Sequence, residues 1–154
     1  MSNLRETIEN TIKTFGENNT LGVKTKDTSL FSSVLAENCI RQYRPFAFIN
    51  RYPQFFKKEI TNADYEAQMK VELQTMQEVV QDLTKTSIDE VQRTATIWTT
   101  QNVTTVDGTK RTVEVIWDLT FTEDGTRISQ ILEFVDTFES TKMLEQILAG
   151  ASHA

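Results

Sequence analysis

The chain has 154 residues, of which 38% are hydrophobic and 25% charged, and these values suit one soluble globular domain spanning 1–154. Its net charge of −6 argues against nucleic acid as a partner, because neutralising phosphates requires a basic surface. The only cysteine, Cys39, excludes an internal disulfide and a cysteine-rich zinc site. The only histidine, His153, is next to last, so we expect neither histidine-based catalysis nor a metal site.

The N-terminal segment is polar and lacks the apolar core of a signal peptide. No run of about 18 apolar residues occurs, so we expect no membrane partner and a cytoplasmic location.

The first half of the chain has the spacing of helices. Apolar residues recur three or four positions apart at the start, at Leu4, Ile8, Ile12 and Phe15. Gly16 predicts the end of this helix, and the polar segment 17–27 predicts a loop. A short second helix is expected over 30–35, with Asp27 or Thr28 as its N-cap.

A short strand is expected over 37–45, where Pro45 ends it. An unusually aromatic segment, 46–56, follows. A third helix is expected to begin near Thr61 or Asn62, with Asp64 in its first turn.

From residue 78 the apolar period changes to two, which is typical of strands. Four strands are expected, over 78–90, 90–105, 110–122 and 126–138. The sequences VDGT and EDGT predict hairpins between the last three strands. A helix over 140–150, with Asp136 and Glu139 as a capping pair, completes an α+β domain.

The turn type decides which side chains share a face of the sheet. Three-residue loops with a bulge at both Asp-Gly turns would place Val115 opposite Thr99 on one side and opposite Glu133 on the other, and Trp117 opposite Ile131. Glu133 then lies on the more apolar face, which should face the helices. Two-residue turns would slip the pairing by one and move Glu133 to the other face. We favour the bulged turns, because they give the more consistently apolar face.

Glu133 and Arg41 are the candidate catalytic residues. A carboxyl on an apolar, helix-covered face should have a raised pKa, which suits a general acid or base. Arg41 shares one side of the first strand with Tyr43, and an arginine beside a pocket can stabilise an oxyanion. The alternatives are a structural ion pair or a carboxylate at the wet rim for Glu133, and a solvated edge cation for Arg41.

Several apolar and aromatic side chains are candidates for a substrate-binding wall. They are Tyr43, Phe48, Phe56, Tyr65, Met69, Val115 and Trp117. The alternative is that these side chains only fill the core and close its open end. Trp98 is expected on the opposite face.

Three stretches resemble a known family: AENCIRQYRP (36–45), TNADYEAQM (61–69) and FTEDGTRISQILEFVDT (121–137). They are similar to segments of the SnoaL-like, NTF2-like isomerases and cyclases of fungal secondary metabolism. This family includes the meroterpenoid isomerases of the terretonin and austinol pathways and the brevianamide semipinacolase. The resemblance implies a cone-shaped α+β barrel, with three N-terminal helices over a curved antiparallel sheet and a short C-terminal helix, and a homodimer.

The resemblance also implies an enzyme that needs no cofactor and moves protons in a hydrophobic pocket, with Glu133 and Arg41 as the catalytic pair. We therefore expect an isomerase or cyclase acting on a polyketide, meroterpenoid or indole alkaloid intermediate. One alternative is a pericyclase that acts by holding its substrate in a reactive shape. Another is a non-catalytic dimer that binds a hydrophobic ligand.

Overall fold

A computed structural model describes residues 3–152, so His153 lies outside the described residues. The five strands form one curved sheet in the order β1-β5-β4-β3-β2. Their bounds are Leu35–Arg44 (β1), Met76–Asp89 (β2), Thr94–Thr105 (β3), Lys110–Phe121 (β4) and Ile128–Val135 (β5). Within the described chain, no helix is long and apolar enough to cross a membrane.

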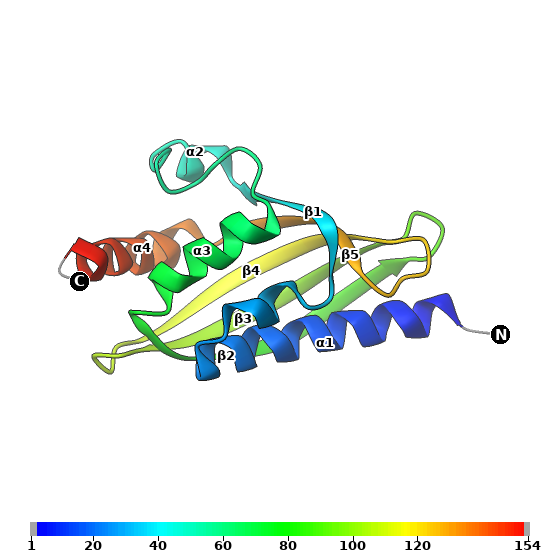
Figure 1. Ribbon diagram of the computed structural model, residues 1–154, viewed down its shortest axis with the longest axis horizontal. Coiled ribbons are helices and arrows are strands. Elements are labelled where there is room, and N and C mark those ends of the chain that lie inside the picture. The colour runs from blue at the N-terminus through cyan, green and yellow to red at the C-terminus, as the bar shows by residue number, and fades with distance from the viewer. Residues whose placement is uncertain (1–2, 153–154) are drawn as a thin grey trace.

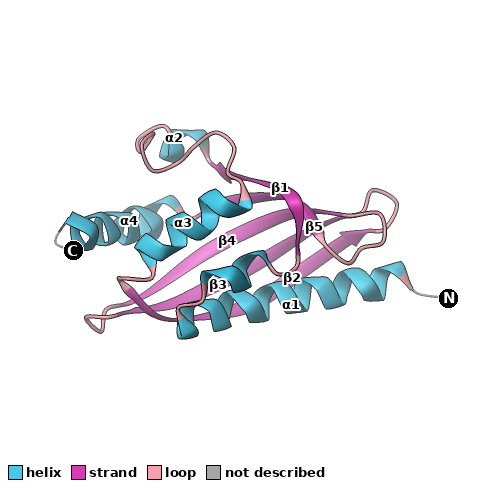
Figure 2. Ribbon diagram, in the orientation of Figure 1, coloured by secondary structure: helices cyan, strands magenta, loops and turns pink. Residues whose placement is uncertain are grey.

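The helices gather over one face of this sheet (Figure 1, Figure 2). They are α1 (Leu4–Thr25), the 3₁₀ turn η1 (Thr28–Ser32), the short α2 (Phe46–Ile49), α3 (Asn62–Glu72) and α4 (Thr137–Ser152). α1 packs along β2, α3 packs against β1, and α4 contacts both β4 and α3. The expected α+β class and cone-like arrangement are confirmed.

One strand pairing differs from the expected antiparallel sheet. β1 pairs with β5 in parallel, with Arg41 opposite Ile131 and Tyr43 opposite Glu133. Hairpin signals identify only strands that follow each other in sequence, so they gave no direction for this long-range pair.

The first helix is longer than predicted, because α1 continues through Gly16 and the expected polar loop. Its buried side continues at Gly22 and Val23. A Cβ atom at Gly22 would lie 2.9 Å from the Phe31 ring, so the glycine allows η1 to pack closely. The helix ends at Lys26, which has a left-handed φ of 59°.

The two later helix starts follow the predicted caps. Asp27 accepts a hydrogen bond from the Ser29 backbone N–H at 3.1 Å, but only a 3₁₀ turn follows, because β1 already begins at Leu35. Thr61 and Asp64 form a reciprocal capping box at α3.

The β3–β4 hairpin has the predicted register, with Val115 opposite Thr99. In the β4–β5 hairpin Trp117 lies opposite Glu133, so the predicted pairing is wrong by two residues. Phe121 lies opposite Ile128 and Thr120 opposite Gln130, so the longer turn and the bulge at the end of β4 together give this shift.

A shift of two preserves the face, because side chains alternate with a period of two. The predicted interior residues are therefore all buried: Ala95, Ile97, Val113, Val115, Trp117, Leu119, Phe121, Ile131, Glu133 and Val135.

The two turn glycines offer a matched test of the turn geometry. Gly108 and Gly125 have φ values of +86° and +76°. A Cβ atom at Gly108 would meet nothing, whereas one at Gly125 would lie 2.9 Å from Leu4 Cδ1. We expect Gly108→Ala to lower the free energy of unfolding by about 1 kcal/mol through backbone strain alone. Gly125→Ala should lower it by about 2–4 kcal/mol, because overpacking adds to the strain. Equal losses in urea denaturation would contradict this packing of α1 on the turn.

Candidate active site

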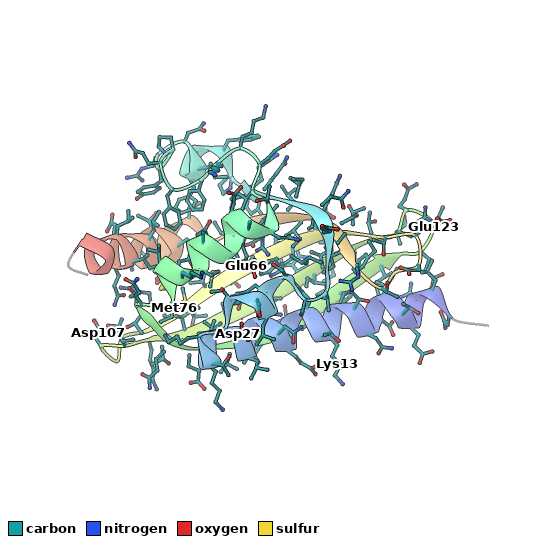
Figure 3. All side chains as sticks on the ribbon, viewed as in Figure 1. Lys13, Asp27, Glu66, Met76, Asp107 and Glu123 are labelled. Atoms are coloured by element: carbon teal, nitrogen blue, oxygen red, sulfur yellow. The ribbon has the colours of Figure 1, made fainter. Side chains whose placement is uncertain are left out.

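A cavity of about 180 Å³ lies between α3, α4 and the sheet, and its wall is mostly apolar. Met76, labelled in Figure 3, lines it at the start of β2. The structure places all of the predicted binding residues in this wall: Tyr43, Phe48, Phe56, Tyr65, Met69, Val115 and Trp117. Glu133 also lines the cavity. Whether these residues bind a substrate stays a prediction.

Glu133 forms a buried ion pair with Arg41. The Arg41 Nη1 group donates a hydrogen bond to Glu133 Oε1, and the two residues are only 2% and 6% exposed. The pair forms because β1 and β5 are neighbours and both side chains point to the interior. The structure therefore contains the ion pair that the sequence left as an alternative reading of Glu133.

Arg41 itself lies behind the cavity wall and does not line it. Its guanidinium carbon is 3.4 Å from the centre of the Tyr65 ring and 5.9 Å from that of Trp117. Its Nη2 group is buried without a hydrogen-bond partner. Arg41 is thus placed to hold Glu133 from behind the wall, and its expected role toward an oxyanion stays a prediction.

The environment of Glu133 favours proton transfer. Burial raises the pKa of this carboxyl above its ordinary value, while the charge and hydrogen bond of Arg41 act in the opposite direction. A carboxylate held in an apolar wall is a stronger base than one in water. The buried pair can therefore present a carboxylate base to a cavity with a mostly apolar wall.

A second carboxyl lines the cavity, and the sequence analysis did not identify it. The Gln68 side-chain amide donates to Glu72 Oε1 at 2.8 Å and to the Tyr43 hydroxyl at 3.3 Å. Desolvation raises the pKa of Glu72 to about 7, opposed by the Gln68 hydrogen bond and reinforced by Glu133. Residues three apart on a helix lie on the same side, so the position of Glu72 three residues after Met69 could have indicated that it lines the cavity.

Trp117 is held rigidly in the wall. Its indole N–H donates to Thr99 Oγ1 at 2.9 Å, and that hydroxyl donates to the Val115 carbonyl at 2.9 Å. Phe15 packs edge-on against the indole, with ring centres 5.3 Å apart. The indole N–H is therefore engaged and does not offer a donor to the cavity.

The aromatic segment 46–56 covers one end of the cavity, where α2 lies beyond β1 in Figure 1. Phe56 contacts Tyr43, Phe48 and Phe55 with ring centres 4.9, 5.5 and 5.0 Å apart. These rings both line the cavity and close one end of the core, and their part in binding a substrate stays a prediction. The enclosed space is smaller than the roughly 300–1,000 Å³ of most ligand pockets.

The remaining candidates have structural positions. Trp98 lies on the outer face of the sheet and is 46% exposed. Asp136 accepts hydrogen bonds from the backbone N–H groups of Phe138 and Glu139 and so caps α4. Among the residues that the structure describes, no cluster of potential metal ligands occurs.

Solved structures show the same fold. The BvnE pinacolase from Penicillium brevicompactum aligns with a TM-score of 0.78 at 19% identity, over 97% of this chain and 96% of its own. PrhC from Penicillium brasilianum aligns with a TM-score of 0.77 at 15% identity, over 97% and 94%. An NTF2-like protein of unknown function from Burkholderia pseudomallei aligns with a TM-score of 0.68 at 15% identity, over 93% and 98%.

A scan against protein-family models and a search of curated proteins gave no match. The structural alignments show that this chain has the NTF2-like fold, which it shares with these proteins.

The raised pKa of Glu72 gives a test of the site by stability alone. The folded protein holds this proton more tightly than the unfolded chain, so stability falls as pH rises from about 4.5 through about 7. Glu72→Gln removes this penalty. At about pH 8 we expect the variant to gain up to about 3 kcal/mol in the free energy of unfolding, and little at about pH 4.

Denaturant titrations across this range measure the difference between variant and wild type. Glu66→Gln is the matched control, because Glu66 lies on the same helix outside the cavity wall (Figure 3). A gain from Glu72→Gln that is equal at both pH values would contradict the raised pKa.

Proposed function

We propose that the protein is a cofactor-independent isomerase or cyclase that rearranges a hydrophobic secondary-metabolite intermediate of the polyketide, meroterpenoid or indole alkaloid kind. The observation that carries the proposal is Glu133, a buried carboxylate held by Arg41 in the wall of a mostly apolar cavity. One structural neighbour, BvnE from Penicillium brevicompactum, is a pinacolase, which supports a rearrangement as the class of reaction.

In the proposed mechanism Glu133 removes a proton from an activated carbon of the substrate. Arg41, from behind the cavity wall, favours the ionised form of Glu133 and holds its carboxylate in one orientation. The rigid aromatic wall holds the substrate in one orientation and excludes water, which favours an intramolecular outcome over hydrolysis.

The aromatic segment 46–56, which covers one end of the cavity, limits the size of the substrate that can bind there. A tricyclic or larger intermediate would need more space than the cavity of about 180 Å³ provides, and outward movement of the aromatic side chains of this segment would supply it. We propose that the segment opens for such a substrate and closes on it.

A small unsaturated ketone tests the acid–base chemistry without knowledge of the natural substrate. Cyclohex-3-enone is small enough for the cavity, and its conversion to the conjugated cyclohex-2-enone is followed by ultraviolet absorbance. We expect wild type to catalyse this double-bond shift and Glu133→Gln to lower kcat/KM about 10²-fold or more. The matched control is Glu123→Gln, in the distant β4–β5 turn (Figure 3), which should behave as wild type.

The alternatives give different results in the same assay. Turnover that survives in Glu133→Gln would favour a pericyclase or another enzyme that acts by positioning alone. Binding of the ketone without turnover would favour a carrier of hydrophobic ligands.

We also propose that the outer face of the sheet joins two copies of the chain. Trp98 lies opposite Ile116, and Ile116 lies opposite Phe134, so these side chains form one apolar row across three strands. Trp98 and Phe134 are 46% and 49% exposed, and an isologous dimer would cover the row on both copies.

Light scattering at micromolar concentration should therefore give twice the monomer mass of 17.7 kDa. Phe134→Lys should shift the protein to the monomer, because it would place a charge in the covered row. A monomeric wild type would contradict the interface.

A further inference from the structure

Glu72 differs from Glu133 in what surrounds its carboxyl. It lies in the last turn of α3, on the helical side of the cavity, whereas Glu133 projects from the sheet. The hydrogen bond that the structure gives its carboxyl comes from the neutral amide of Gln68, and no salt bridge to it occurs among the described residues. Glu133, in contrast, is in contact with a guanidinium.

These surroundings separate the protonation states of the two carboxyls. The contact with Arg41 favours the charged form of Glu133, and the charge of Glu133 in turn disfavours a second charge at Glu72. Two carboxyls whose environments differ in this way have the arrangement of an acid and a base that act on one substrate.

Resting on the proposed function, we propose that Glu72 is a second catalytic residue, the general acid that gives a proton to the substrate after Glu133 has removed one from a different atom. The substrate class that fits is a compound with an acidic C–H on one side and a proton-accepting carbon or oxygen on the other. A β,γ-unsaturated ketone is the simplest example.

For cyclohex-3-enone the reaction consists of two proton transfers, one at C2 and one at C4. Glu133 takes a proton from C2, and the C–H electron pair moves into the ring to form a dienolate. C4 of the dienolate takes the proton of Glu72, which gives cyclohex-2-enone. Glu133 is then protonated and Glu72 is ionised, and exchange with water restores both, so no oxidant or other reactant is consumed.

The different exposure of Glu72 and Glu133 to solvent determines where the proton at C4 of the product comes from, and this origin can be measured. Glu72 is partly exposed and takes its proton from water before each turnover, whereas Glu133 is only 6% exposed and releases the substrate's proton to water after the product has formed. The proton delivered to C4 therefore comes from solvent. A mechanism in which Glu133 alone shuttles one proton would return the substrate's own proton instead.

The groups around Glu72 that affect its titration come from three elements. They are Glu133 on β5, Arg41 and Tyr43 on β1, and Tyr65 on α3. Burial raises the pKa of both tyrosines above 10, and it raises the pKa of Glu133 as well, where Arg41 opposes it. Glu72 has no such cation in contact within the described part of the chain, and burial raises its pKa to about 7.

The experiment is turnover of cyclohex-3-enone in D₂O by wild type, Glu72→Gln and the control Glu66→Gln, with deuterium at C4 of the product measured by NMR after subtraction of the uncatalysed rate. We expect wild type and Glu66→Gln to place one solvent deuterium at C4. Glu72→Gln should lower kcat about 10²-fold, and its residual product should retain protium at C4.

A pH profile separates a catalytic role from a structural one. Because Glu72 must be protonated to act, kcat in wild type should fall as pH rises above about 7, and this fall should be absent in Glu72→Gln. Retention of protium at C4 by wild type, or a kcat and pH profile unchanged in Glu72→Gln, would overturn the proposal while leaving Glu133 as the base.

A titration of ¹³C-labelled glutamate carboxyls by NMR, with Glu72→Gln for assignment, tests the same residue without turnover. A Glu72 resonance that titrates as an ordinary exposed carboxyl would overturn the acid role, whatever the rates. Wild type that binds the ketone but does not turn it over would instead refute the proposed function, and the acid role with it.

Discussion

Much of the structure around the cavity depends on the contact between Arg41 and Glu133. Two charges that are removed from water require each other, because an unpaired buried charge is destabilising by several kcal/mol. Around Arg41, the backbone pairs with β5 on one side and exchanges two hydrogen bonds of 2.9 Å with Ile60 on the other. Ile60 immediately precedes the cap of α3, so one residue connects the edge of the sheet, the ion pair and the helix that covers the cavity.

The same contact explains the character of the cavity. The guanidinium lies against the Tyr65 ring, which keeps Tyr65 in the wall, and Glu133 is the group that reaches the enclosed space. Apolar and aromatic side chains supply most of the remaining surface, and Glu72 with Gln68 supplies polar groups from α3. Chemistry in such a site depends on a few fixed polar atoms and on the exclusion of water.

The residues on the interior face of the sheet were predicted well. Side chains alternate between the two faces, so a register error of two residues leaves every side chain on the same face. Glu133 was placed on the correct face although its partner in β4 was wrong by two residues. Long-range features were not predictable in the same way. The parallel β1–β5 pair has no local signal, and the close contact between Gly22 and Phe31 outweighs the stop that Gly16 suggested. Glu72 was missed because a charged residue next to an apolar stripe is usually solvated, and only the tertiary structure encloses it.

The alternation of side chains also has an evolutionary consequence for the β4–β5 turn. A slip of two residues slides β5 along β4 but keeps Glu133 inside, whereas a slip of one, without a compensating bulge, turns the carboxyl to the outer face and separates it from Arg41. Residues gained or lost at this turn therefore have to be taken up by the loop itself or by a bulge. Among descendants of this sequence the length of the turn can vary, while the pairing of β5 with β4 is held by the need to keep a charge buried beside its partner.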